Sequence, residues 1–197
     1  TEILLRLGEL GRETCDYDEA KRTFEEGLAL SRAQGDLWGE AESLAVIGYL
    51  ALFQGQFENG RDSLERAVEI RQQVGDRHGM ADNRSTCGTA HWFCGRYAEA
   101  DSLLEQSLAT SEAAGDILNK IGVITLQGEV RAWAGRYQEA RGLARTVLAN
   151  TDVLRIDTAR AHRVLGWVAL GNEVYAEAQG WLAESVAGHR ELWSQYA

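Results

Sequence analysis

The chain has 197 residues, of which 45% are hydrophobic and 25% are charged. This composition is typical of a folded chain that is soluble in water, and it argues against intrinsic disorder. The formal net charge is −10, with 20 basic residues scattered among 30 acidic ones. Because binding phosphates requires clustered Lys and Arg, we expect this region to have no nucleic-acid partner.

The sequence also lacks the marks of a membrane or secreted protein. No apolar run approaches the roughly 20 residues that a membrane-spanning helix needs, and no signal peptide opens the sequence. Three cysteines (Cys15, Cys87 and Cys94) form no disulfide framework. We therefore expect a cytoplasmic location and no contact with a membrane. Thr1 falls where a repeat begins and there is no initiator Met, so we interpret the chain as a piece of a longer protein.

The predicted elements are all helices. There is no proline among the 197 residues, and each proline inside a helix would cost about 3 kcal/mol. Glycine followed by aspartate is expected to end one helix and cap the next, while a lone glycine closes the first helix of a pair. The Gly-Asp pairs lie at residues 35–36, 75–76 and 115–116, and the lone glycines are Gly55, Gly95 and Gly135. These boundaries predict helices of about 15–17 residues.

A three-residue pattern recurs along the chain at intervals of 40 residues, as from Gly48 to Gly88. A glycine inside a first helix is followed by a ring and then by a small residue. We expect the glycine and the small residue to let two backbones approach closely, and the ring to fill the wedge between the two helices of one hairpin. The pattern comprises Gly8, Tyr17 and Ala20; Gly48, Phe57 and Gly60; Gly88, Tyr97 and Ala100; Gly128, Tyr137 and Ala140; and Gly166, Tyr175 and Ala178.

Self-similarity at such a period predicts a solenoid of stacked units. In chain order the expected repeats cover residues 1–35, 36–75, 76–115, 116–151 and 152–197, each a hairpin of two helices in a single array. The fifth copy is the weakest, because Asn150, Thr151 and Asp152 replace the Gly-Asp pair and two residues are lost. We expect the packing to change at that point.

The first copy resembles the tetratricopeptide repeat family, whose spacing is matched by Leu4, Leu7, Gly8, Tyr17, Ala20, Phe24 and Leu28. The resemblance covers nearly the whole chain and implies an all-α, right-handed superhelix of about five helical hairpins. The chain departs from the usual pattern in its longer period and in lacking the proline that ends each unit. Both departures agree with longer helices and with the extended variety of the repeat.

In this family the first helix of each hairpin lines a concave groove that receives extended segments of partners. The resemblance therefore places a ligand groove along these helices. We leave open whether its rings face the groove or pack between hairpins. The candidates are Glu9, Glu42, Tyr49, Phe53, Asp82, Thr89, Trp92, Phe93, Glu129, Trp133, Arg163 and Trp167.

The charges of these candidates suggest what the groove would bind. Leu5, Glu9, Ala45 and Tyr49 stand where a basic clamp for a C-terminal carboxylate would be, so a chaperone-tail receptor is not expected. The carboxylates suggest instead a neutral or basic, partly apolar protein or peptide segment.

Catalytic and metal chemistry find little support in the sequence. Cys87, His91 and Cys94 face one side of a helix and have the spacing of a soft-metal site, but a structural zinc wants four ligands. No Cys-x-x-Cys pair or second His is near in sequence, so we expect Cys87 to be a small buried thiol and expect no metal and no cofactor. No catalytic residue set is indicated. The polar Gln127 and Arg131 are expected to form hydrogen bonds across hairpins, with contact to a ligand as the alternative.

The sequence thus predicts a non-catalytic binding scaffold. The resemblance suggests the repeat region of a multidomain bacterial regulator acting in signalling or transcription. Two alternatives remain open. One is a sensor of a small ligand or signal peptide, with the aromatic groove closing around it. The other is self-association through the last helix, where Leu182, Val186, Trp193 and Tyr196 recur at helical spacing.

Overall fold

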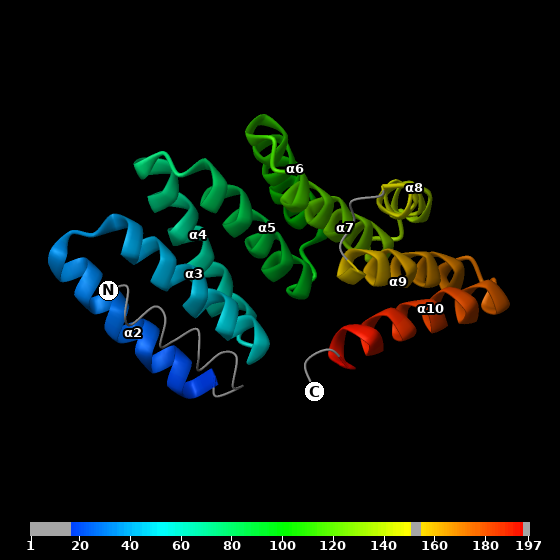
Figure 1. Cartoon of the computed structure of the whole chain (residues 1–197), viewed down its shortest axis with the longest axis horizontal. Helices are drawn as coiled ribbons and strands as arrows, with labels where there is room; N and C mark the ends of the chain where they lie inside the picture. Colours follow the sequence, from blue (N-terminus) through cyan, green and yellow to red (C-terminus); the bar gives the residue numbers. More distant parts are fainter. Residues whose placement is uncertain (1–16, 151–154, 195–197) are drawn as a thin grey trace. The chain divides into compact units, whose positions relative to one another are not determined.

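The computed structural model describes residues 17–150 and 155–194, and every regular element within these ranges is a helix (Figure 1). The prediction of an all-α repeat fold is confirmed. In chain order the helices are α2 (Tyr17–Gln34), α3 (Leu37–Phe53), α4 (Phe57–Val74), α5 (Arg77–Phe93), α6 (Tyr97–Ala114), α7 (Ile117–Trp133), α8 (Tyr137–Leu148), α9 (Arg155–Gly171) and α10 (Tyr175–Ser194).

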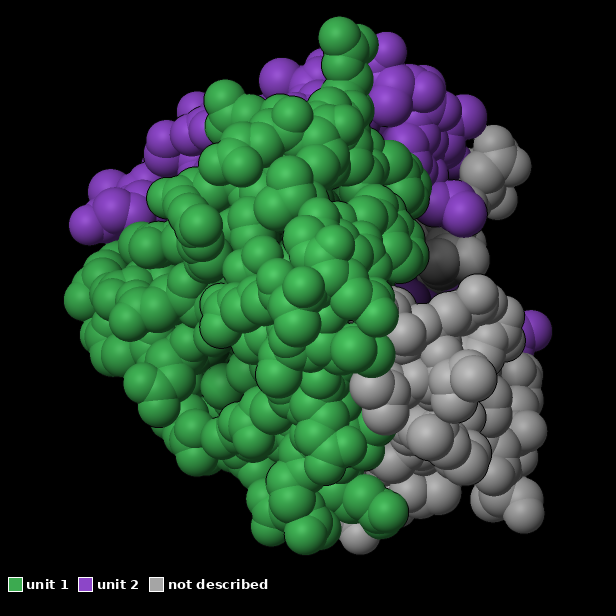
Figure 2. Space-filling view, turned by 90° about the vertical axis from the view of Figure 1, so that its left-hand side faces the viewer, with its two compact units in different colours: residues 1–96 green, residues 97–197 purple. Residues whose placement is uncertain are grey.

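The chain divides into two compact units, residues 1–96 and residues 97–197 (Figure 2). The first unit contains α2 to α5 and the second contains α6 to α10. Within each unit, helices that follow one another in the chain pack against each other. The expected third repeat, residues 76–115, contributes its first helix to one unit and its second helix to the other. That all repeats form a single array stays a prediction.

The Gly-Asp junctions have the predicted geometry. Gly35, Gly75 and Gly115 have φ angles of 67°, 74° and 69°, in the left-handed region that favours glycine. The aspartate that follows accepts a hydrogen bond from a backbone N–H in the first turn of the next helix; for Asp36 and Gly39 the N···Oδ1 distance is 2.9 Å. This bond satisfies a donor that the helix leaves without a partner, and the carboxylate also favours the positive end of the helix dipole.

Gly48 and Gly60 bring α3 and α4 into close contact. A Cβ atom added at Gly48 would lie 2.9 Å from the carbonyl oxygen of Gly60 and 2.8 Å from Cγ of Leu64. The carbonyl belongs to the backbone and cannot move aside cheaply. The close approach predicted from the repeated glycine is therefore confirmed for this hairpin.

The same prediction is wrong at Gly128. An added Cβ there would meet only side chains, at 3.6 Å from Val164 and 3.7 Å from Leu143, which is ordinary van der Waals contact. At Gly166 the nearest atoms belong to the side chain of Leu182, at 2.6 Å. At both of these glycines the nearest atoms thus belong to side chains, and the one backbone atom among those given for Gly166, the nitrogen of Leu182, is 3.5 Å away.

The repeated rings also differ from expectation. Tyr137 packs across Gly171 of α9, so it contacts the following helix as well as the apolar cluster that its own hairpin shares with α9. Tyr175 is 67% exposed and fills no wedge. Gly8, and the side chain of Tyr17, lie outside what the structure describes. Ala20, Ala100, Ala140 and Ala178 are all buried, as small residues at tight contacts should be.

None of the helices within the described residues has the length and apolar character required to cross a bilayer.

We expect Gly48→Ala to lower the free energy of unfolding by about 1–3 kcal/mol, because the added methyl group would push α3 away from α4. The matched control is Gly142→Ala on α8, where nothing lies within 4 Å of the new Cβ. That change should instead raise stability by about 0.5–1 kcal/mol, since alanine loses less entropy in a helix. Urea denaturation followed by circular dichroism measures both, and equal effects would contradict the close-contact account.

Candidate functional site

A groove of about 650 Å³ runs between the first helices α3 and α5 in the first unit. Its walls are the faces of these two helices, and α4 forms part of its floor. It is lined by Trp38, Glu42, Ala45, Val46 and Tyr49 of α3, by Leu64 and Arg71 of α4, and by Asp76, His78, Gly79, Asp82, Asn83 and Thr86 at and beyond the start of α5.

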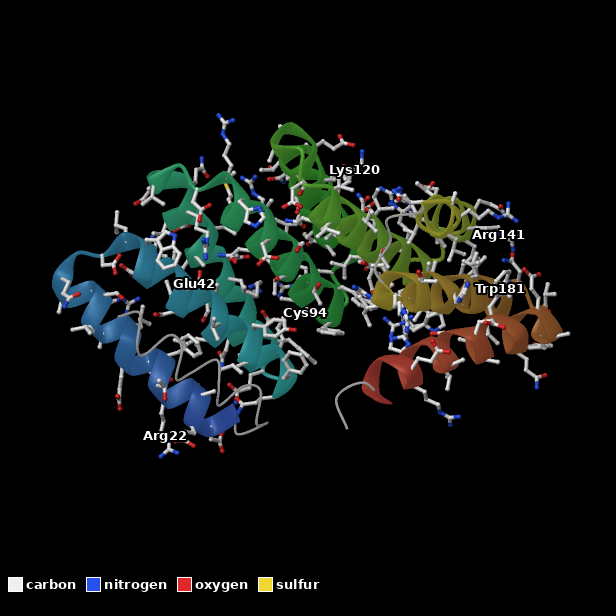
Figure 3. All side chains as sticks on the ribbon, in the orientation of Figure 1. Arg22, Glu42, Cys94, Lys120, Arg141 and Trp181 are labelled. Carbon is white, nitrogen blue, oxygen red and sulfur yellow. The ribbon has the colours of Figure 1, made fainter. Side chains whose placement is uncertain are left out.

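Arg71 connects the helices at the end of this groove where α5 begins, which we call the head of the groove. Its guanidinium group pairs with Glu42 of α3 and with Asp76, which caps α5, while its side chain is only 7% exposed. Figure 3 labels Glu42 among the side chains of the first unit. A buried cation is stable only when it is paired and hydrogen-bonded. The pairing therefore ties three helices to one charged group.

Gly79 makes room for this arginine. A Cβ atom at that position would collide with the guanidinium group. The N–H of Gly79 donates a hydrogen bond to Asp76 Oδ1 at 2.9 Å. Burial alone would raise the pKa of Asp76, but this bond and the guanidinium group of Arg71 outweigh it and lower the pKa below its ordinary value.

Two rings stand on the α3 side of the groove. Trp38 is 53% exposed and Tyr49 is 38% exposed. The ring of Phe53 packs edge-on against Tyr49, with centroids 4.8 Å apart. Exposed rings beside carboxylates offer a surface for both apolar groups and cations.

The structure places only some of the predicted groove residues in this groove. Glu42, Tyr49 and Asp82 line it. Thr89 lies beyond it and donates its hydroxyl to the carbonyl of Ser85, at 3.1 Å. Glu9 lies outside the described residues.

Three further candidates gather at the C-terminal ends of α3 and α5. Phe93 stacks on Trp92 at 5.1 Å and packs against Phe57 at 5.2 Å. It nevertheless remains 47% exposed, and Phe53 is 58% exposed. Phe93 therefore packs against the neighbouring helix α4 and also reaches solvent. None of these three rings lines the groove between α3 and α5, so their part in ligand binding stays a prediction.

In the second unit Glu129 is not a groove residue. It is fully buried on α7 and accepts hydrogen bonds from Arg160 at 2.7 Å and from Arg163, both on α9. The expectation that its carboxylate contacts a ligand is corrected here, because the two guanidinium groups enclose it. The sequence does not indicate this pairing, since Arg160 and Arg163 lie more than 30 residues after Glu129.

The other candidates of the second unit form a ring cluster around one of these arginines. The guanidinium carbon of Arg163 lies 5.1 Å from the ring centroid of Trp167, within the range of a cation–π interaction. Trp167 in turn meets Trp133 edge-on at 5.5 Å. Trp133 is 56% exposed, so the cluster is open to solvent at this ring.

The structure agrees with the predictions made for Arg131 and Cys87. Arg131 of α7 donates to Asp101 of α6 at 3.0 Å, which confirms the expected hydrogen bond between helices. Cys87 is buried as predicted, and burial raises the pKa of its thiol to about 12. A neutral thiol is a poor nucleophile, so Cys87 is unsuited to covalent catalysis.

The sequence analysis missed the groove residues Trp38, Arg71, His78 and Asn83. A signal for Trp38 was present, because it precedes Glu42 by four residues and so shares its helix face. Arg71 lies on the buried face of α4 together with Leu64 and Ala67, a position typical of an apolar residue. Its role depends on Glu42 and Asp76 arriving from other elements, which spacing does not show.

The sequence pattern of the tetratricopeptide repeat matches residues 39–113. No curated protein matches the sequence. Solved structures with a similar fold are numerous.

Three of these structures illustrate the similarity. BtubC (BKLC) from P. vanneervenii has a TM-score of 0.76 at 15% identity, over 97% of this chain and 80% of that one. A putative kinesin light chain from Podosopora anserina with nearly identical TPR-like repeats has a TM-score of 0.75 at 17% identity, over 100% and 96% of the two chains. The Rap conjugation gene regulator of plasmid pLS20, solved with the Phr* peptide, has a TM-score of 0.74 at 15% identity, over 96% of this chain but 53% of its own.

We expect Asp76→Asn to reduce stability in a pH-dependent way. The asparagine keeps the cap but loses the charge that pairs with Arg71, which should cost about 1.5–3 kcal/mol at neutral pH. Because the folded pKa of Asp76 is lowered, its contribution is complete above the unfolded pKa and disappears as pH falls through the folded value. As the pH is lowered from 5 to 2, the free energy of unfolding of the variant should therefore fall less than that of the parent. The series is measured at intervals of about one pH unit.

The matched control is Asp36→Asn. Asp36 makes the same cap bond to Gly39 at 2.9 Å, and in the part of the chain that the structure describes no arginine pairs with it. Thermal unfolding across the pH series should show a clearly smaller change for this variant. Equal changes at both positions would show that Arg71 contributes nothing through Asp76.

Proposed function

We propose that the chain is a non-catalytic scaffold that binds a protein or peptide segment in the groove between α3 and α5, because the tetratricopeptide repeat pattern matches residues 39–113, which include most of this groove. The observation that carries this proposal is the groove itself, about 650 Å³ in volume and lined by rings and carboxylates on two first helices.

The lining suggests a segment that is basic and partly apolar. Glu42, Asp76 and Asp82 contribute three carboxylates, against the one guanidinium group of Arg71. A groove with this excess of negative charge attracts cationic side chains and repels acidic ones. Trp38 and Tyr49 would then pack against the aliphatic or aromatic parts of the ligand.

An extended peptide suits this site better than a compact molecule. The groove follows helix faces that run from Trp38 to Tyr49, a rise of about 16 Å at 1.5 Å per residue. A stretched chain covers that distance in about five residues. The Rap regulator, which shares the fold, was solved with a peptide, and a regulatory role in a bacterial cytoplasm is part of the same proposal.

The test uses two fluorescent peptides of equal length, one alternating Lys or Arg with Leu and one in which Glu replaces each basic residue. We expect fluorescence anisotropy to show binding of the basic peptide, weaker at higher salt because the charges are screened. Trp38→Ala and Tyr49→Ala should each weaken binding about tenfold, the usual size of an aromatic anchor.

The matched control is Tyr175→Ala, which removes a ring that is 67% exposed on α10, outside the groove. It should leave peptide affinity unchanged. Preference for the acidic peptide, or equal losses in all three variants, would contradict the proposed groove.

A second candidate function, self-association, is favoured by the outer face of α10. This face forms an open hollow of about 640 Å³ with Leu170, Tyr175, Leu182 and Val186 among its lining residues. Val186 is 51% exposed. Apolar surfaces of this kind mark interfaces, and we propose a second copy as the partner, because two such faces related by a two-fold axis present matching apolar surfaces.

We expect light scattering to detect a dimer that dissociates in the Val186→Asp variant, since a buried carboxylate without a partner is costly. The control is Ala176→Asp, which adds the same group at an exposed position of α10 outside the hollow. Its dimer should persist. A monomeric parent at all concentrations would rule out this second candidate.

A further inference from the structure

We propose that Glu65, Cys87 and His91 form a binding site for a zinc ion between α4 and α5. None of the three lines the groove between α3 and α5, so this site is separate from the proposed peptide site. Carboxylate, thiolate and imidazole are the three side-chain groups with which proteins bind zinc.

The distances between the three groups suit one ion. One ligand atom from each residue lies within 4.8 Å of the others. In a tetrahedral zinc site neighbouring ligand atoms are about 3.3–3.8 Å apart, since Zn–N and Zn–O bonds are about 2.0–2.1 Å and Zn–S about 2.3 Å. His91 Nε2 and Glu65 Oε1 are already 3.3 Å apart, so at most about 1 Å of side-chain movement closes the site.

The two helices position these groups for different reasons. Cys87 and His91 are four residues apart on α5 and therefore lie one above the other on the same face. The packing of α4 against α5 then adds Glu65. The spacing along the sequence pointed to Cys94 as the third ligand and did not indicate Glu65, which lies 22 residues before Cys87.

Two of the three proposed ligands are buried, while the third is open to solvent. Cys87 is 1% exposed and His91 is 8% exposed, whereas the side chain of Glu65 is 49% exposed. The site therefore opens to solvent on the Glu65 side, where zinc can enter and a water molecule can supply the fourth ligand. Among the described residues, Nδ1 of His91 is buried without a hydrogen-bond partner, so the imidazole is only partly satisfied by its contact with Glu65.

The charges balance when zinc binds. The Cys87 S–H bond breaks, the sulfur lone pair forms the Zn–S bond, and the proton leaves to solvent. Thiolate and carboxylate together carry two negative charges, which neutralise Zn²⁺.

Arg61, which is also on α4, pairs with Glu65 and competes with zinc for this carboxylate. Its Nε lies 3.8 Å from Glu65 Oε1. The same guanidinium group also pairs with Glu58 and, at 2.5 Å, with Asp62. Arg61 therefore keeps two carboxylate partners when Glu65 turns to the metal.

The experiment uses a Cys15→Ser/Cys94→Ser background, in which Cys87 is the one remaining cysteine of the sequence. Zn²⁺ is titrated in competition with a chromophoric chelator, under reducing conditions. Co²⁺ then replaces zinc as a spectroscopic probe, because a thiolate bound to cobalt gives a charge-transfer absorption. We expect one equivalent of zinc per chain and this absorption with cobalt.

Two variants and a matched control identify the ligands. Cys87→Ser should abolish the cobalt charge-transfer band, and Glu65→Gln should weaken zinc binding at least about tenfold. Glu69→Gln removes a carboxylate one helical turn further along α4 that pairs with Arg66 instead, and its affinity should be unchanged. Circular dichroism confirms that each variant is folded; Glu65 and Glu69 are both exposed, so these two changes are tolerated.

Zinc binding in the background protein no tighter than in its Cys87→Ser variant would overturn the proposal. Unchanged affinity in Glu65→Gln would overturn it equally, because the ion would then be bound elsewhere. A stoichiometric site with the band, sensitive to Glu65 and insensitive to Glu69, supports it.

Discussion

Helical hairpins can stack in a regular array only if each helix begins and ends at a corresponding residue. In this chain a glycine with a positive φ angle followed by a capping aspartate provides that constraint, at residues 35–36, 75–76 and 115–116. The glycine turns the chain where other residues would be strained, and the aspartate satisfies the first N–H groups of the next helix. Because these junctions recur at a fixed interval, α3, α5 and α7 each have 17 residues.

The candidate site depends on this regularity. The first helices α3 and α5 are equal in length. They place Trp38, Glu42 and Tyr49 on one side of a groove and Asp82 on the other. The junction itself takes part, since Asp76 caps α5 and also pairs with Arg71. The residue that defines a repeat boundary thereby also fixes the charge at the head of the groove. A binding surface of this kind needs no catalytic geometry, only rigid helix faces with suitable chemistry.

The features predicted correctly from the sequence are those set by residues close together along the chain. Helix ends follow from glycine and aspartate within a few residues, and the close contact of α3 with α4 follows from Gly48 and Gly60. What it predicted poorly depended on charges that meet across the fold. Glu129 looked like a groove carboxylate because its helix position is right, yet Arg160 and Arg163 enclose it. Tyr175 has the spacing of a wedge residue but is exposed, because spacing does not reveal what packs against the last described helix.

The collision of a Cβ at Gly79 with the guanidinium group of Arg71 implies that an arginine at the first of these positions needs a glycine at the second. The chain contains an internal comparison, because one period later Ser111 and Asn119 occupy the positions of Arg71 and Gly79. With the short serine in place of the arginine, a side chain is present at the second position. Among homologous repeats we therefore expect arginine at the first position to be accompanied by glycine at the second, and side chains at the second to occur only where the first is small.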